Sequence, residues 1–155
     1  MIRGVSTIAT LALLTVGACS RHEPDSTPDG AVKIWLEKME VATDPNMAHE
    51  AFELLGPKAR ANLQERADLA SKMQGRQESA EDMLAQGRFG LKYRPKSMTS
   101  AVNGDDATVT VIGADAQTDH TTIHCVRENG QWHVEPDLPD LAPLRHREEP
   151  ETDAG

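Results

Sequence analysis

The spacing of apolar residues along this chain changes once, from a period near 3.6 to a period of 2. Between residues 30 and 87, apolar side chains recur every three or four positions, which is typical of helices with one buried face. Between residues 96 and 135 they alternate with polar side chains, which is typical of strands. Helical and strand patterns do not alternate. The order therefore predicts an α+β fold, with N-terminal helices packed on one face of an antiparallel sheet of hairpins.

Capping and breaking residues predict four helices. They are a helix beginning near Asp29 or Gly30, a second capped by Asp44 with Pro45 at its first position and Gly56 at its end, a third from Pro57 to Gly75, and a short fourth within residues 78–87, capped by Ser79 and closed by Gly87. Their expected buried positions are, in order, Val32, Trp35, Leu36 and Met39; Met47, Ala48, Ala51, Phe52 and Leu55; Leu63, Ala67, Ala70 and Met73; Met83 and Leu84.

Two turn signals predict how the strands pair. Asn129-Gly130 is the strongest short hairpin signal, and a two-residue turn there fixes the register of the last hairpin. A four-residue loop over residues 103–106 fixes the register of the first hairpin. The expected pairs are Val102 with Ala107, Ser100 with Val109, Met98 with Val111, Arg127 with Trp132, Val126 with His133, Cys125 with Val134, and His124 with Glu135. The side chains expected on the core face of the last hairpin are Ile123, Cys125, Trp132 and Val134.

The first 18 residues have the three parts of a secretory signal peptide. Arg3 supplies a positive start, an uncharged apolar run follows, and small residues precede Cys19. The run is shorter than the roughly 20 apolar residues that a membrane-spanning helix needs. The four residues Val-Gly-Ala-Cys that end at Cys19 resemble the bacterial lipobox, with valine in place of the commoner leucine.

The lipobox resemblance implies a bacterial lipoprotein. The signal peptide, residues 1–18, would be removed, and the sulfur of Cys19 would carry a diacylglycerol with fatty-acyl chains such as palmitate. Because two or more acyl chains hold a protein firmly on a bilayer, the expected localisation is the cell envelope, membrane-anchored through lipid. Ser20 after the cysteine resembles sorting to an outer membrane, facing the periplasm. A plain secreted protein or an uncleaved anchor are the alternatives.

Composition divides the chain after the signal peptide into three parts. Residues 19–29 are expected to be the lipidated cysteine and a flexible linker, residues 30–136 a single α+β domain, and residues 137–155 a disordered, acidic, proline-rich tail. The whole chain carries 16 basic and 25 acidic residues, a net charge of −9. This balance argues against a nucleic-acid partner and against a protein face lying on anionic lipid. The lipid anchor is therefore the only expected membrane contact.

The domain also resembles a known superfamily over residues 30–136. The opening helix "AVKIWLEKM", the segment "LLGPKARANL" and the closing hairpin "RENGQWHVEP" are similar to the nuclear-transport-factor-2-like proteins. The positions that match their closing strand are Glu128, Gly130, Trp132 and Val134. The resemblance implies a strongly bent sheet that wraps a helix into a cone with an interior pocket. Trp35 and Met39 would line that pocket or else belong to the core, and no catalytic motif carries over.

The polar face of the last hairpin holds the candidate site. His124 lies opposite Glu135, with His133 diagonal to His124, so two imidazoles and a carboxylate are within reach of each other. Directly opposed side chains have Cβ atoms about 5 Å apart. Such a group suits acid–base catalysis or zinc binding, or else it is a solvated or interface-facing sheet surface. His120 lies on the same face, but four residues at about 3.3 Å each put it roughly 13 Å from His124.

Two other residues have a chemical and a structural interpretation. If Cys19 is acylated, Cys125 has no partner within the chain, so we expect it to be a small buried hydrophobic residue rather than a reactive thiol. Arg127 and Trp132 are cross-strand partners, so the guanidinium can lie over the indole ring in a cation–π contact.

Known catalytic, nucleotide-binding and metal-binding motifs are absent from the sequence, so no cofactor and no metal are expected. The leading hypothesis is a non-enzymatic, lipid-anchored envelope protein that binds a small molecule or a protein partner through its sheet or cone. One alternative is a small enzyme of the same fold with His124 and Glu135 as its acid–base pair. Another is an envelope assembly or scaffold factor that meets a protein partner through a strand edge or the acidic tail.

Overall fold

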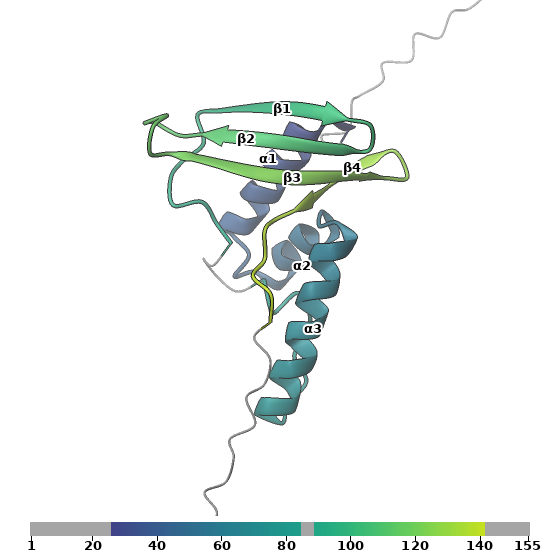
Figure 1. Ribbon diagram of the computed structural model, residues 1–155. Coiled ribbons are helices and arrows are strands. Elements are labelled where there is room, and N and C mark those ends of the chain that lie inside the picture. Colours follow the sequence, from purple (N-terminus) through teal and green to yellow (C-terminus); the bar gives the residue numbers. More distant parts are fainter. Residues whose placement is uncertain (1–25, 85–88, 142–155) are drawn as a thin grey trace, which may run out of the picture.

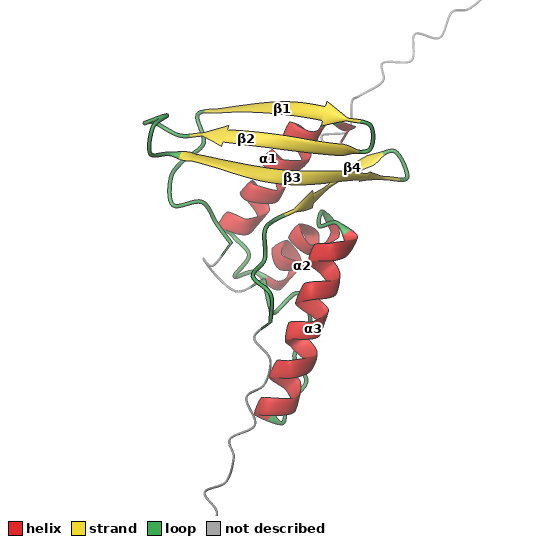
Figure 2. Cartoon of the chain, viewed as in Figure 1, coloured by secondary structure: helices red, strands yellow, loops and turns green. Residues whose placement is uncertain are grey.

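The computed structural model describes residues 26–84 and 89–141 of the 155-residue chain. Helices come first in the sequence and a four-stranded antiparallel sheet follows, which confirms the predicted α+β class. Figures 1 and 2 show the sheet with α1 behind it, while α2 and α3 lie below. The signal peptide, Cys19, most of the predicted linker, Gly87 and residues 142–155 lie outside the described residues.

Each helix begins where the sequence supplies an acceptor or a proline. The hydroxyl of Thr27 accepts a hydrogen bond from the Gly30 N–H at 3.2 Å, and the carboxylate of Asp44 accepts one from the Asn46 N–H at 2.8 Å. Proline occupies the first turn of all three helices, where its missing N–H costs nothing. Gly75 ends the third helix in a left-handed conformation, as predicted. The helices are α1 (Pro28–Glu40), α2 (Pro45–Glu53) and α3 (Pro57–Gln74).

The sheet is an up-and-down arrangement with the strand order β1-β2-β3-β4. Every predicted cross-strand pair of both hairpins is present. One detail of the first hairpin is wrong: Asn103 pairs with Asp106, so the loop has two residues, Gly104 and Asp105, instead of four. The register survives because two-residue and four-residue loops set the same pairs here. The strands are β1 (Ser97–Asn103), β2 (Asp106–Ile112), β3 (His120–Glu128) and β4 (Gln131–Glu135).

The core lies between α1 and one face of the sheet, which we call the inner face. Helix α1 contacts all four strands, α2 packs on α1, and α3 contacts β4. The described core contains no buried polar or charged residue, so apolar burial is its main source of stability. Its largest fully buried side chains are Trp35, Trp132, Leu55, Leu63, Val32, Val109, Val111, Val134 and Cys125.

Three predictions about the helical part are wrong. Residues 80–84 form turns rather than the expected fourth helix, although Ala80 and Leu84 are buried. Met73 is 72% exposed instead of buried, because the last turns of α3 project beyond the sheet and α1 (Figure 1). Gly56 does not end α2; it is the N-cap residue of α3.

The segment after β4 remains in contact with the domain. Leu138 is partly buried against the core, and the Arg66 guanidinium donates a hydrogen bond to the carbonyl of Pro139. In Figure 1 this part of the chain runs downward beside α3. The packed unit therefore extends past Pro136, the expected end of the domain. No helix in the described residues combines the length and the apolar character that a membrane span requires.

Candidate functional site

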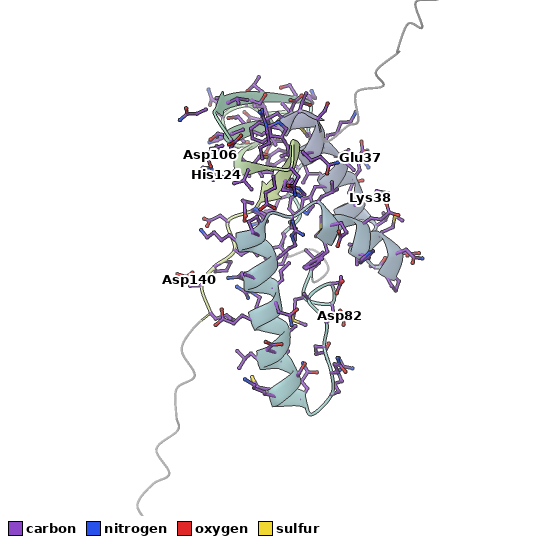
Figure 3. All side chains as sticks on the ribbon, turned by 90° about the vertical axis from the view of Figure 1, so that its right-hand side faces the viewer. Glu37, Lys38, Asp82, Asp106, His124 and Asp140 are labelled. Atoms are coloured by element: carbon purple, nitrogen blue, oxygen red, sulfur yellow. The ribbon has the colours of Figure 1, made fainter. Side chains whose placement is uncertain are left out.

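The last hairpin brings together the residues that the sequence singled out. His124 pairs with Glu135 and Val126 pairs with His133, on the face of the sheet opposite α1, which we call the outer face. Figure 3 shows His124 and Asp106 on one side of the molecule, with Glu37 and Lys38 of α1 on the other. The predicted juxtaposition on the backbone is therefore confirmed, and the directions of the side chains decide what the group can do.

Glu135 is directed toward α3. Its two carboxylate oxygens accept hydrogen bonds from the backbone N–H groups of Lys58 at 2.9 Å and Ala59 at 2.8 Å. The first N–H groups of a helix have no partner within it, and its N-terminus carries a partial positive charge. Gly56 at the N-cap has no side chain to fill this role. Glu135 therefore caps α3 from another element.

Gly56 leaves the space that this cap occupies. A Cβ atom on Gly56 would lie 2.3 Å from the Oε1 atom of Glu135, which is closer than atoms can approach without moving. The same segment is bonded to β4: the Gly56 N–H donates to the Val134 carbonyl at 2.9 Å, and the Val134 N–H donates to the Leu54 carbonyl at 2.8 Å. Residues 54–56 thus bond to Val134 on the free side of β4 and hold α3 against Glu135.

The three histidines of the outer face have different surroundings. His124 is exposed, and His120 is exposed four residues earlier on β3. His133 is half-buried, and its Nδ1 atom is buried with no hydrogen-bond partner within the described part of the chain. In residues 26–84 and 89–141, no group of three or more His, Cys, Asp or Glu side chains is arranged to hold a metal ion.

A shallow cleft lies beside His124 on the outer face. Its volume is about 200 Å³, and strands β1, β2 and β3 all contribute to it. Its polar side chains are those of Asn103, Asp106, Thr108 and His124. Asp106 and His124 both extend from this side of the sheet into the open (Figure 3). The cleft offers a carboxylate, an amide and a hydroxyl that can accept hydrogen bonds from one occupant.

A second cleft lies where α2 meets the turn at residues 79–84, and the sequence-based reasoning missed it. It has a volume of about 310 Å³, and His49, Glu81 and Asp82 line it. His49 Nδ1 lies 3.5 Å from Glu81 Oε1, at the limit of a hydrogen bond. The sequence signal that could have located this turn was the Ser79-x-x-Asp82 spacing, which is typical of a capping box.

Hydrogen bonds within this turn lower the pKa of both carboxylates. The backbone N–H of Ser79 is the main cause for Asp82, and the Ser79 hydroxyl adds to it. For Glu81 the main cause is its own backbone N–H, opposed by partial burial and supported by Ser79 and His49. Both groups are therefore held as carboxylates, which makes the turn a structural unit rather than a proton donor at neutral pH.

The remaining predicted residues lie in the core or on its rim. Cys125 is buried and its Sγ lies 3.9 Å from the Pro28 carbonyl, which confirms the expected small hydrophobic residue. Burial raises the pKa of the Cys125 thiol to about 12, with Asp29 and Glu135 adding to the shift. Trp35 and Met39 are buried and line neither cleft described above. The guanidinium of Arg127 lies 4.3 Å from the ring centre of Trp132, the expected cation–π contact.

Comparison of the chain with models of protein families, with curated proteins and with solved structures found no match.

Proposed function

We propose that this chain is a lipid-anchored protein of the bacterial cell envelope whose domain binds a protein partner, without catalysis, through the outer face of its sheet. The cleft beside His124 is the observation on which the proposal depends. It joins polar side chains from three strands on the outer face of a sheet whose inner face packs on an apolar core. Its volume of about 200 Å³ is below the roughly 300–1,000 Å³ of pockets that enclose small molecules, so it fits a single side chain of a partner better.

The chemistry of the cleft favours a cationic side chain as its occupant. The carboxylate of Asp106, the amide oxygen of Asn103 and the hydroxyl of Thr108 are all hydrogen-bond acceptors. A guanidinium presents five donors in a planar fork and suits such a set. The net charge of −9 for the chain supports the same choice, because it attracts basic surfaces over several ångströms.

The anchor would keep the domain close to the membrane. Helix α1 begins at Pro28, nine residues after Cys19 in the sequence. A chain spans at most about 3.5 Å per residue, so the domain would lie within about 30 Å of the acylated sulfur. That distance suits partners that are themselves in or near the envelope membrane.

The two alternative functions receive unequal support. An acid–base pair of His124 and Glu135 requires a carboxylate free to exchange a proton with substrate. Both oxygens of Glu135 accept hydrogen bonds from α3, so this enzyme is the less supported alternative. The scaffold alternative depends on a strand edge or on the acidic tail. It is supported by the outer side of β1, with which no described strand pairs.

Titration with a basic peptide tests the cleft. With hexa-arginine added to the isotope-labelled full-length chain, we expect amide NMR shifts centred on Asp106, Thr108 and His124. Asp106→Asn should weaken binding about tenfold, whereas Asp105→Asn, which removes the same charge from the neighbouring turn, should weaken it less than twofold. Equal effects of the two substitutions would mean non-specific attraction, and no localised shifts would contradict the proposed cleft.

Replacing Cys19 tests the anchor separately. We expect the Cys19→Ser protein to lack the acyl groups, as measured by mass spectrometry, and to leave the membrane fraction. Cys125→Ala is the matched control, because it removes the other cysteine and should leave the protein with the membrane. A Cys19→Ser chain that stays with the membrane would contradict the lipid anchor without affecting the cleft.

A further inference from the structure

The two edge strands of the sheet, β4 and β1, differ in whether their outward backbone groups have partners among the described residues. On β4 the outward N–H and C=O groups of Val134 are bonded to residues 54–56, and α3 stands against the same edge. At the opposite edge, β1 pairs with β2 on one side, and no described residue pairs with it on the other. Figure 1 shows β1 along the upper border of the sheet, away from the helices below.

The outward backbone groups of β1 belong to alternate residues. In an antiparallel strand, consecutive residues direct their N–H and C=O groups to opposite sides. Asn103 faces Asp106 across the two-residue turn. The backbone N–H and C=O groups directed at β2 are therefore those of Ser97, Thr99, Ala101 and Asn103. The groups of Met98, Ser100 and Val102 therefore point away from the sheet. Their side chains lie on the inner face, because Met98 pairs with Val111 and Val102 with Ala107 of the core.

This edge lacks the usual protection against pairing with another strand. Natural edges carry lysine, proline, a bulge or an inward-pointing charge. The seven residues of β1, "SMTSAVN", contain no charged residue and no proline, and their register with β2 runs without a bulge. Val102 is 53% exposed although it lies on the inner face. The apolar core therefore does not cover the edge strand at this position.

We propose that β1 pairs with β1 of a second copy of this chain, antiparallel and centred on Ser100. Of the possible registers, the one that pairs Ser100 with itself and Met98 with Val102 uses all three outward residues of each strand. It also places the exposed Val102 beside a methionine of the other copy, which buries apolar surface on both sides of the axis.

The charges at the two ends of β1 complement each other in this register. Arg94 and Lys96 precede the strand, and Asp105 and Asp106 follow it. Antiparallel pairing puts the basic end of one copy beside the acidic turn of the other, twice about the two-fold axis. One pair of groups opposes the association: Asp29 lies 3.4 Å from the Ser100 hydroxyl, so the two Asp29 carboxylates approach the axis on the inner face.

A disulfide at the two-fold axis tests the proposal and its register. In Ser100→Cys, the paired residues have Cα atoms about 5.5 Å apart, within the range that a disulfide spans. We expect mild oxidation of the full-length chain to yield a covalent dimer, at least fivefold more than in Thr99→Cys, whose side chain is on the outer face. The unsubstituted chain measures any background from Cys19 and Cys125.

Substitutions along the edge give the second measurement. Combined with Ser100→Cys, Val102→Lys should reduce the dimer yield at least fivefold, because it places a charge at the contact. Val41→Lys is its control, since Val41 is similarly exposed, at 50%, and lies away from the sheet in the turn after α1. Asp29→Asn should raise the yield by removing the repulsion at the axis.

Three outcomes would overturn the self-pairing: equal cross-linking of Ser100→Cys and Thr99→Cys, equal effects of the two lysine substitutions, or a Ser100→Cys product that joins the chain to a different protein. Because Val102 and Ser100 do not line the cleft beside His124, failure here leaves the proposed partner site unaffected.

Discussion

At the scale of the residue, Glu135 shows how one side chain can connect distant parts of a fold. It lies at the end of the last strand, yet its carboxylate serves the first turn of α3, 76 and 77 residues earlier. Glycine at position 56 leaves room for this arrangement, because a Cβ atom there would displace that carboxylate. The pair Gly56 and Glu135 therefore works as a helix cap whose two halves come from separate elements.

Removing the carboxylate should measure the value of this cap. We expect Glu135→Ala to lower the free energy of unfolding by about 0.5–2 kcal/mol, the usual cost of losing an N-cap. Glu128→Ala is the control, because its ion pair with Arg60, at 3.5 Å, is partly exposed and contributes at most about 1 kcal/mol. Gly56→Ala should cost less in the Glu135→Ala background than alone, since the clash is gone. Urea unfolding that shows simple additivity would contradict the shared cap.

Cys125 gives a second prediction, about reactivity and pH. Burial raises the pKa of its thiol to about 12, above the 9.0 of an exposed thiol. The folded state therefore holds this proton more tightly than the unfolded state. Its contribution to stability is complete below pH 9 and is lost as the pH rises toward 12. At pH 8 a thiol reagent should modify Cys125 at least a hundredfold more slowly in the folded chain than in urea. Comparable rates would contradict the burial.

At the scale of the element, local signals determined what could be predicted. The helix starts follow from Asp44, Pro45 and Pro57, and the register of β3 and β4 follows from Asn129-Gly130, whose φ angles of 52° and 86° suit a tight hairpin turn. Each of these signals acts within a few residues. The cap by Glu135 could not be predicted, because nothing near it in the sequence indicates α3.

The residues after α3 show that a local capping signal can be present where no helix forms. Ser79, the predicted cap, and Asp82 exchange the hydrogen bonds of a capping box. However, a cap alone does not offset the entropy of nucleating a helix, and the described residues after it form only turns. Similarly, Met73 continues the apolar period of α3 beyond the point where any described element packs on it.

The carboxylates of the turn that contains Glu81 and Asp82 should make part of the unfolding free energy sensitive to acid. The pKa values of Asp82 and Glu81 are lowered in the folded state, so folding is favoured while these groups are charged. Their contribution is present above the ordinary values of 3.8 and 4.5 and is lost as the pH falls through the lower folded values. Unfolding free energies measured between pH 6 and 2 should fall less steeply for Asp82→Asn than for the unsubstituted chain. Asp105→Asn, in an exposed turn, controls for the lost charge.

At the scale of the whole molecule, contacts are concentrated on one side. Helix α1 covers the inner face, and residues 54–56 together with α3 cover the β4 edge. The outer face near His124 and the β1 edge are left accessible by the described residues. These two surfaces share strand β1, so self-pairing of the edge would place two clefts on one continuous sheet. A two-fold partner could then engage both, with a gain in affinity that neither cleft gives alone.

The segment after β4 completes the covered side, and shortening it tests where the domain ends. Leu138 packs on the core and Arg66 bonds the Pro139 carbonyl, so a chain that stops after Pro136 loses both contacts. We expect it to lose about 1 kcal/mol of unfolding free energy, roughly half the value of a fully buried leucine. A chain that stops after Leu141 keeps both contacts and should unfold at the same urea concentration as the full chain. If the two truncations behave alike, the segment contributes nothing to the fold, and the domain ends with β4.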